Sequence, residues 1–325
     1  MSKKTILITG TLGFIGSNFI RYVTKHHPEY RWVGVDKAVY DYCLSNTFNH
    51  PDYKFYLADI ANEHIVDRIF KIEKPSIVIN MAAESFVCSS IENPNPFIYS
   101  NVMGTQTLIN ASVKYGIDRF IQISTDEVYG SHESKRDISW TELSAVKPKN
   151  PYSASKFAAE SILFAANQTH KLNFNITRCC NVFGPRQPSD RNLVPKSIKT
   201  TITNMPMPIY GDGSHIREYL FVEDKITAIM AVLKNGVVNE TYNIGSGIEF
   251  SNIEMVNKIA SMIENKIPNI NFTTDRKGHD FRYSVNCDKI KFLGWLPRHS
   301  FEQGMSKCID WYIENKWYFD VKSTI

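Results

Sequence analysis

The sequence has no Cys-x-x-Cys pair and no group of cysteines with histidines, so it predicts neither a zinc site nor a redox dithiol, and no metal is expected. It has no run of five basic residues, and its net charge is only +4, which argues against a nucleic-acid partner. It has no apolar run near the ~18 residues of a membrane span and no signal peptide. Its six cysteines are therefore expected to be reduced structural thiols, and the protein to be cytoplasmic without a membrane partner.

What the sequence does contain is a regular alternation of strand-like and helix-like segments in its first half. The predicted strands cover residues 5–9, 31–36, 54–57, 76–81, 119–125 and 173–178, and the predicted helices cover residues 14–24, 63–71, 97–115 and 152–166. Such alternation predicts an α/β fold in which helices cover both faces of a parallel sheet. Ligands of these sheets bind beyond the carboxyl ends of the strands.

A glycine turn joins the first predicted strand to the first predicted helix. Gly10, Gly13 and Gly16 have the spacing G-x-x-G-x-x-G, which lets backbone approach a pyrophosphate at a helix amino terminus. Asp36 ends the second strand, where a carboxylate accepts hydrogen bonds from ribose hydroxyls and repels a 2′-phosphate. The predicted cofactor is therefore NAD rather than NADP.

Two further strand ends are expected to contact the same cofactor. Asp59 and Ile60 could close over the adenine, although Asp59 is almost as well explained as a turn residue. Ala82 and Ala83 would leave room for the cofactor ribose. The predicted cofactor residues are Gly10, Gly13, Phe14, Ile15, Gly16, Asp36, Asp59, Ile60, Ala82 and Ala83, together with Tyr152 and Lys156.

The chain is expected to form two domains. Residues 1–183 are predicted to be an NAD-binding domain with a Rossmann-type doubly wound parallel sheet, to which a segment near 218–247 returns. After about Gly184 the pattern loosens into prolines, glycines and short elements, while aromatic residues stay frequent. Residues 184–325 are therefore predicted to be a smaller C-terminal substrate-binding domain.

Tyr152 and Lys156 are four residues apart, so on a helix they share one face. A free tyrosine has a pKa of roughly 10 and is mostly neutral at pH 7. A nearby ammonium and a cationic nicotinamide ring favour the phenolate, which makes Tyr152 a usable base for a sugar hydroxyl. Lys156 can also hold the cofactor ribose.

Asp126 and Glu127 directly follow the fifth predicted strand. Two acids at a strand end can simply be a solvated turn. Beside an oxidation site they also suit an elimination, with Glu127 removing an acidified C–H proton and a protonated Asp126 donating to the departing hydroxyl. Neighbouring carboxyls tend to split their pKa values, as this pairing needs. Thr125 is placed to hydrogen-bond the sugar oxygen beside Tyr152.

Several stretches of the chain together resemble the extended short-chain dehydrogenase/reductase superfamily, and within it the NAD-dependent nucleotide-sugar 4,6-dehydratases. The resemblance runs from about Lys4 to Trp317. The triplet TDE separates the sequence from the sugar 4-epimerases of the same superfamily, which usually have small or hydroxylic residues where Asp126 and Glu127 stand. The matching stretches are TGTLGFIG, MAAESFV, STDEVYG, PYSASK, RCCNVFGPRQ, IYGDGSHIREYLFVED, YNIGSG and DRKGHDFRY.

The resemblance implies a redox-neutral hydro-lyase. Tyr152 deprotonates the 4-hydroxyl as hydride leaves C4 of glucose, Glu127 and Asp126 eliminate water across C5 and C6, and the stored hydride returns to C6. It also implies a set of substrate residues, in which Arg217 and Arg276 grip the diphosphate because guanidinium suits phosphate. The implied substrate residues are Glu84, Ser85, Asn101, Asn181, Arg191, Arg217, Arg276 and His279.

Some residues depart from the pattern of the bacterial enzymes that act on dTDP-glucose. Phe86 and Cys88 stand where those enzymes usually have His and Asp, the loop 188–196 is altered, and Arg191 takes the place of a lysine. The stretch DKAVYDYCLSN resembles the plant and animal branch, which includes UDP-glucose 4,6-dehydratases of rhamnose synthesis. UDP-glucose is therefore expected over dTDP-glucose. A difference of one methyl is worth only ~1 kcal/mol, so the discrimination can be loose.

Two other functions stay open at this point. The chain could be a UDP-sugar 4-epimerase, or a non-catalytic NAD-binding protein, although the latter has no physical reason to keep Tyr152, Lys156, Asp126 and Glu127 together. The resemblance further implies a homodimer joined by a four-helix bundle from residues 97–115 and 152–166 of each chain.

Overall fold

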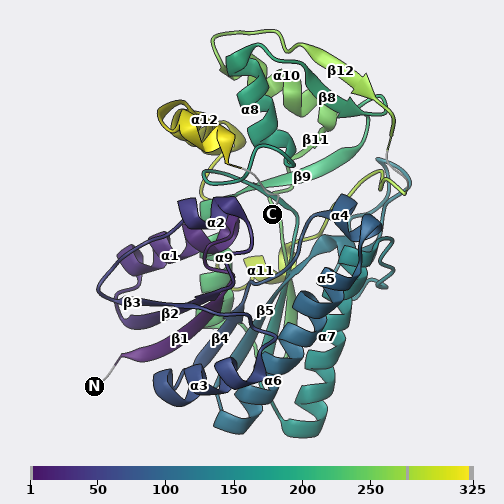
Figure 1. The fold of residues 1–325 in the computed structure, drawn as a ribbon. Helices are drawn as coiled ribbons and strands as arrows, with labels where there is room; N and C mark the ends of the chain where they lie inside the picture. Colours follow the sequence, from purple (N-terminus) through teal and green to yellow (C-terminus); the bar gives the residue numbers. More distant parts are fainter. Residues whose placement is uncertain (1–2, 276–277, 322–325) are drawn as a thin grey trace.

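A computed structural model describes residues 3–275 and 278–321 of the chain (Figure 1). Seven parallel strands form the main sheet in the order β10-β6-β5-β4-β1-β2-β3. All six predicted strands lie in this sheet, and the predicted α/β Rossmann-type fold is confirmed. The strands are β1 (Lys4–Thr9), β2 (Tyr30–Asp36), β3 (Tyr53–Leu57), β4 (Ile77–Asn80), β5 (Arg119–Thr125), β6 (Phe174–Cys179) and β10 (Glu240–Ile244).

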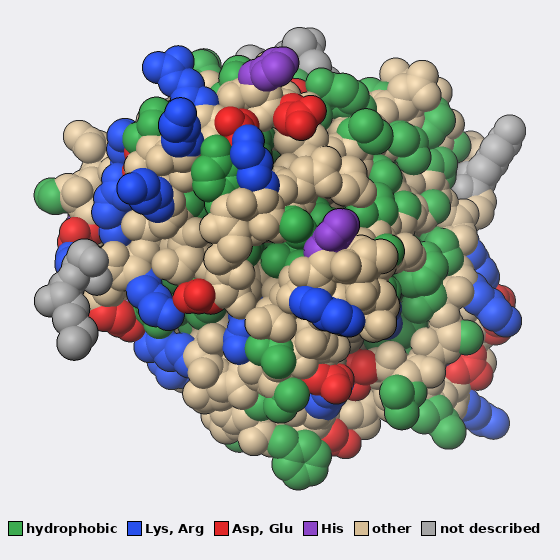
Figure 2. Space-filling view, turned by 90° about the horizontal axis from the view of Figure 1, so that it is seen from below, with side chains coloured by type: hydrophobic (Ala, Val, Ile, Leu, Met, Phe, Trp, Pro, Cys, Tyr) green, Lys and Arg blue, Asp and Glu red, His purple; other side chains and the backbone are tan. Residues whose placement is uncertain are grey.

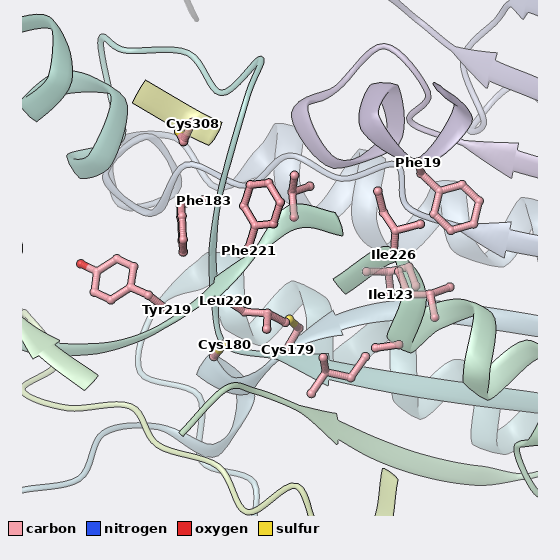
Figure 3. Packing of buried hydrophobic residues seen from close by; sticks show 14 of the residues in the cluster. Phe19, Ile123, Cys179, Cys180, Phe183, Tyr219, Leu220, Phe221, Ile226 and Cys308 are labelled. Atoms are coloured by element: carbon pink, nitrogen blue, oxygen red, sulfur yellow. The ribbon is translucent and has the colours of Figure 1, made fainter. Parts of the chain in front are cut away.

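Helices cover both faces of the sheet because its strands alternate apolar side chains to either side. On one face Ile6 and Ile8 of β1 belong to a cluster with residues of α1 (Phe14–His26) and α9 (Val222–Asn235). On the other face Leu7 packs with residues of α3 (Glu63–Glu73), α6 (Gly104–Tyr115) and α7 (Pro151–His170). Figure 3 shows Phe19 of α1 and Ile226 of α9 close to Ile123 of β5.

Two predicted helices differ in detail from the structure. The predicted helix 97–115 begins with α5 (Asn95–Phe97) and a π-helical stretch η1 (Ile98–Met103) before α6. The predicted helix 152–166 is longer at both ends in the structure and runs from Pro151 to His170. It begins at Pro151 because Asn150 caps it by accepting a hydrogen bond from the backbone of Ser153. That cap places Tyr152 in the first turn, next to the end of β5.

A smaller layer lies above the carboxyl end of the sheet in Figure 1. Its strands pair as β11-β9-β7 and β12-β8. Within the predicted return segment, α9 and β10 pack with the main sheet, whereas β9 joins the smaller layer. The two-domain division itself stays a prediction. The elements are β7 (Asn181–Phe183), α8 (Leu193–Thr203), β8 (Met207–Tyr210), β9 (Ile216–Phe221), β11 (Glu249–Ser251), α10 (Asn252–Met262), β12 (Ile270–Thr273) and α12 (Phe301–Glu314).

Short elements fill the connections. They are α2 (Asp41–Ser45), α4 (Val87–Glu92), the 3-10 helix η2 (Asp126–Tyr129), α11 (Asp288–Lys291) and the 3-10 helix η3 (Lys316–Asp320). Five of the six cysteines are buried and Cys88 is exposed, and the expectation of reduced structural thiols stays a prediction. Within the described ranges, no helix combines the length and apolar character needed to cross a bilayer.

Candidate active site

A pocket runs along the carboxyl ends of β1, β2, β4 and β5, where the strand order reverses between β1 and β4. Doubly wound sheets bind dinucleotides at this switch point. Every predicted cofactor residue lines it. The lining includes Gly10, Gly13, Phe14, Ile15, Gly16, Asp36, Asp59, Ile60, Ala82, Ala83, Tyr152 and Lys156.

The backbone of the glycine turn is packed too closely to admit side chains. Gly10 has a φ of +71°, and a Cβ there would lie 2.8 Å from the backbone of Ala82. A Cβ on Gly16 would lie 2.0 Å from the carbonyl oxygen of Gly10. Helix α1 begins at Phe14 with no acidic side chain in its first turn. The bare turn and the helix terminus together suit a pyrophosphate.

Backbone hydrogen bonds from the glycine turn and from the loop after β2 orient the Asp36 carboxylate. One carboxylate oxygen accepts a hydrogen bond from the Leu12 backbone at 2.9 Å, and the other accepts from Ala38 at 2.8 Å. Asp59 accepts a hydrogen bond from the backbone of Ala61 at 2.8 Å, so it stabilises its own turn and also lines the pocket. These groups fit the adenosine half of NAD.

Tyr152 and Lys156 lie together at the other end of the pocket. Lys156 is buried and donates to the carbonyl oxygen of Ile123 at 2.6 Å. Burial, and then the neighbouring Lys225 ammonium, lower the pKa of Lys156 to about 8. Burial and the charge of Glu127 raise the pKa of Tyr152, against a hydrogen bond with Thr125 that lowers it. With these protein groups alone, Tyr152 is a neutral phenol at pH 7.

Three buried polar atoms near this end have no hydrogen-bond partner among the described residues. They are Ser124 Oγ, Asp126 Oδ2 and Gln187 Oε1. Ser124 and Gln187 line the pocket, and Asp126 directly follows the end of β5. Because buried polar groups in folded proteins are nearly always bonded, this end has unfilled capacity for a polar ligand.

Asp126 and Glu127 begin η2 at the end of β5, with different environments. Asp126 is 1% exposed, and burial and then the Glu127 charge hold its pKa well above the ordinary 3.8. Glu127 is half-buried, and its carboxylate accepts from the side-chain amide of Asn150 at 3.3 Å. Thr125 accepts from the backbone of Glu127 at 3.2 Å. The pair therefore offers a protonated acid beside a second carboxyl group.

The raised pKa of Asp126 has a consequence for stability. The folded state keeps a proton that the unfolded state releases above about pH 4, so the free energy of unfolding falls as pH rises toward the folded pKa. The substitution Asp126→Asn removes the titrating carboxyl group and with it this fall in the free energy of unfolding. We expect the variant to melt at a higher temperature than the wild type at pH 8, with a smaller advantage at pH 5.

Thermal unfolding at both pH values measures this effect. The control is Asp118→Asn at an exposed ion pair with Lys4, which should leave the melting temperature nearly unchanged. A wild type that is the more stable protein at both pH values would contradict the burial argument.

Glu84 is held by the loop after β2. Its carboxylate accepts from the hydroxyl of Tyr40 and pairs with Lys37 at 3.2 Å. The Asn101 side chain accepts from the Glu84 backbone N–H at 2.8 Å and donates to its carbonyl oxygen and to Ser155. Glu84 and Ser85 line the pocket, whereas Asn101 is buried behind them. The geometry thus gives Asn101 a positioning part, and its predicted ligand contact stays a prediction.

The other predicted substrate residues in the described ranges are not part of the lining of the dinucleotide pocket. Arg217 is buried on β9, stacks over the ring of Tyr283 at 4.4 Å and donates to the Asp280 carbonyl oxygen at 2.9 Å. Asn181 is exposed on β7. Arg191 is exposed, donates to Ser89 at 2.6 Å and lies over the ring of Phe86 at 4.7 Å. Arg276 lies outside the described residues.

His279 belongs to a small cluster with His215 and Asp275. Their ligand atoms lie within 4.8 Å of one another, and the two imidazole rings stack at 3.5 Å. His279 also contacts Asp275 at 2.6 Å. Nearly parallel stacked rings direct their nitrogen lone pairs side by side rather than toward one ion, so this arrangement favours hydrogen bonding over shared metal coordination.

Sequence reasoning missed part of the pocket lining. The segment after Asp36 was considered for its family resemblance and not for pocket contacts, yet several of its side chains line the cofactor pocket. Lys225 comes from a helix about 70 residues after Lys156, and no spacing pattern connects the two. The missed lining residues include Lys37, Tyr40, Tyr42, Cys43, Met81, Ser124, Phe86, Gln187 and Lys225.

Residues 6–245 match the model of the NAD dependent epimerase/dehydratase family. The chain belongs to this family. The predicted class, an NAD-dependent nucleotide-sugar 4,6-dehydratase of the extended short-chain dehydrogenase/reductase superfamily, is confirmed, and so is NAD as the cofactor.

The relatives of this family member come from several kinds of organism. It is 43% identical to the low-salt glycan biosynthesis protein Agl12 of Haloferax volcanii, over 95% of the chain and 98% of that protein. It is 39% identical to a dTDP-glucose 4,6-dehydratase of Neisseria gonorrhoeae, over 97% of each. It is 37% identical to a trifunctional UDP-glucose 4,6-dehydratase of Arabidopsis thaliana, over 99% of the chain and 49% of that protein.

A solved structure supports the same assignment. The dTDP-glucose 4,6-dehydratase DesIV of Streptomyces venezuelae was determined with NAD bound. Its structure matches this chain with a TM-score of 0.91 and 34% sequence identity, over 97% of this chain and 99% of DesIV.

Proposed function

We propose that this dehydratase converts UDP-glucose to UDP-4-keto-6-deoxy-glucose, with dTDP-glucose as the competing substrate. The observation that carries the proposal is that Asp126 and Glu127 lie on η2, which packs against α7, the helix that carries Tyr152. Tyr152 lines the cofactor pocket, whereas the two carboxyl groups lie outside its lining. The charge of Glu127 acts on both other groups, so the three lie within electrostatic reach of one another. An epimerase has no use for a buried protonated acid beside its base.

In the proposed reaction each residue moves or holds a proton at a stated atom. Bound NAD supplies the capacity to accept a hydride and to return it. Tyr152 Oη takes the proton of the sugar 4-hydroxyl once the positive charge of Lys156 and of the bound cofactor lowers the pKa of its phenol. Glu127 takes the proton at C5, and Asp126 protonates the departing 6-hydroxyl. Thr125 orients the sugar oxygen beside Tyr152.

The protein must also keep water away from this chemistry. Lys37 and Tyr40, from the loop after β2, bind Glu84 across the pocket. Tyr40 stacks on Tyr42, and both rings line the pocket. We infer that this loop holds the cofactor in place through the cycle, because loss of the cofactor midway would end it.

The choice between uracil and thymine rests on two opposing observations. The stretch DKAVYDYCLSN supports UDP-glucose through its resemblance, and the Arabidopsis relative acts on UDP-glucose by name. The Neisseria relative, named for dTDP-glucose, is slightly more similar. Tyr40, Tyr42 and Cys43 of the stretch line the cofactor pocket, so they bear on cofactor binding more directly than on the base.

Product analysis tests the function. The holoenzyme is given UDP-glucose and dTDP-glucose in parallel, and NMR follows the sugar signals. We expect a 4-keto-6-deoxy product without net NADH, formed with the higher kcat/KM from UDP-glucose. UDP-galactose as the product would establish the epimerase instead. A higher kcat/KM with dTDP-glucose would reverse the choice of nucleotide and leave the reaction unchanged.

We also propose that the enzyme is a homodimer that pairs through η1, α6 and α7, in a pathway of rhamnose or another deoxysugar. Large apolar side chains are exposed there, including Tyr99 (50%) and Met103 (53%) on η1, and Phe164 (36%) on α7. In Figure 2 hydrophobic side chains gather toward the right, the side on which α7 lies in Figure 1. Such patches mark interfaces, and a two-fold pairing of two helices builds a four-helix bundle.

Sedimentation equilibrium at several concentrations is expected to give the mass of two chains. Tyr99→Glu should shift the equilibrium toward one chain, because it places charge within the apolar contact. Leu143→Glu is the matched control, since Leu143 is 97% exposed outside these helices. Equal dissociation of both variants would contradict this interface.

A further inference from the structure

Lys225 is a buried ammonium in the cofactor pocket. It lies in the first turn of α9, is 4% exposed, and lines the pocket with Tyr152 and Lys156. No carboxylate of the described residues forms an ion pair with it. Burying a charge without such a partner disfavours folding, and proteins break this rule mainly at functional sites.

Two carboxyl groups of this region have raised pKa values and form no ion pair with Lys225. Burial and then Glu127 raise the pKa of Asp126, and burial raises that of Glu218 to about 7. Glu160 already forms a buried ion pair with Arg178, with a nitrogen–oxygen distance of 2.6 Å. Lys156 is a second ammonium in the same pocket, and each disfavours the charge of the other. Lys156 and Lys225 therefore bring two cationic side chains together in the pocket, whereas the lining carboxylate Glu84 is paired with Lys37.

We propose that Lys225 raises the reduction potential of bound NAD. In the couple NAD⁺ + 2e⁻ + H⁺ → NADH the nicotinamide ring loses one positive charge. An ammonium in a buried pocket repels the oxidised ring and leaves the reduced ring undisturbed, so it favours NADH. The effect keeps the cofactor in its reduced form while water is eliminated from the sugar. It requires NAD and does not depend on which sugar nucleotide binds.

The competing role for Lys225 is to stabilise the thiolate of Cys179 rather than to act on the cofactor. Burial alone would raise the pKa of this thiol, but a hydrogen bond with Cys180 and the Lys225 ammonium lower it below its ordinary value. If Cys179 were a thiolate, the pair would be neutral and the cofactor would not sense the ammonium. The two roles therefore predict different redox behaviour.

The test is a redox titration of the holoenzyme without sugar nucleotide. Wild type, Lys225→Met and Lys225→Arg are equilibrated with a mediator couple at fixed potential, and the near-ultraviolet absorbance of reduced nicotinamide gives the NADH/NAD ratio. Cofactor released from each variant is quantified first, so that loading is equal. Lys225→Met is expected to lower the ratio about tenfold, which corresponds to about 30 mV for a two-electron couple. Lys225→Arg should stay close to the wild type because it keeps the charge.

Lys225→Gln is measured in parallel as a second neutral variant, in case the methionine variant does not fold or load. An unchanged ratio in the neutral variants would overturn the proposal and assign the ammonium to Cys179. An equal fall in the arginine and neutral variants would overturn it as well, because side-chain shape rather than charge would then set the potential. Neither result depends on the dehydratase reaction, so failure here is distinct from failure of the proposed function.

Discussion

Replacing Tyr152 with Phe is expected to lower turnover roughly 10²–10⁴-fold, the usual contribution of a positioned acid or base. That loss corresponds to about 3–5 kcal/mol of activation free energy. The phenyl ring of the variant still fills the place beside Phe97, so NAD content should stay at the wild-type level. Mixing the variant with substrate should leave the cofactor oxidised, because the 4-hydroxyl keeps its proton.

Steady-state rates and the near-ultraviolet absorbance of the mixed enzyme measure these effects. Tyr115→Phe is the matched control, since Tyr115 ends α6 far from the pocket and bonds to Asp67 at 3.0 Å. Turnover within a few-fold of the wild type in Tyr152→Phe would remove this residue as the base.

Glu127→Gln is expected to have an equally large effect at a different stage. We expect formation of the 4-keto-6-deoxy product to fall roughly 10²–10⁴-fold. Glutamine keeps the size of the side chain and its bond to Asn150, but it does not take a proton from C5. Because Tyr152 is intact, substrate should still reduce the cofactor, and the reduced absorbance should accumulate without a deoxy product.

The two variants together separate the roles of their residues. Glu133→Gln serves as the control for the second, because Glu133 is exposed and forms an ion pair with Lys149 at 2.9 Å. If Glu127→Gln leaves the cofactor oxidised, as Tyr152→Phe is expected to do, then Glu127 acts before the elimination. The proposed assignment of oxidation to Tyr152 and of C5 deprotonation to Glu127 would then be wrong. If it dehydrates at the wild-type rate, another group removes the C5 proton.

The comparison of sequence and structure shows why some site residues were predictable. The glycine turn, Asp36 and the Tyr152–Lys156 pair all depend on short spacings within one strand–turn–helix unit. Their geometry follows from the local repeat of each element, and the structure places all of them in one pocket. Asp126 and Glu127 are adjacent in the chain, so their proximity was also certain.

Contacts between residues from segments that lie far apart in the sequence were predicted less well. Asn101 was expected to line the ligand site, but α7 supplies Ser155 and the end of β4 supplies Glu84, and these occupy its side chain. Lys225 was not predicted at all, because only the packing of α9 brings it to Lys156. Arg217 is held by the Asp280 carbonyl oxygen, from a segment 63 residues away.

The sequence by itself determined the strand–helix alternation of residues 5–178 and the position of the glycine turn, and it supplied the proposal for the acid–base groups, because these features depend on neighbouring residues. The tertiary structure decided which of those groups are buried and what faces them. Burial raises the pKa values of Asp126 and Tyr152 and lowers that of Lys156. Desolvation depends on every atom that surrounds a group, and those atoms come from segments that only folding brings together.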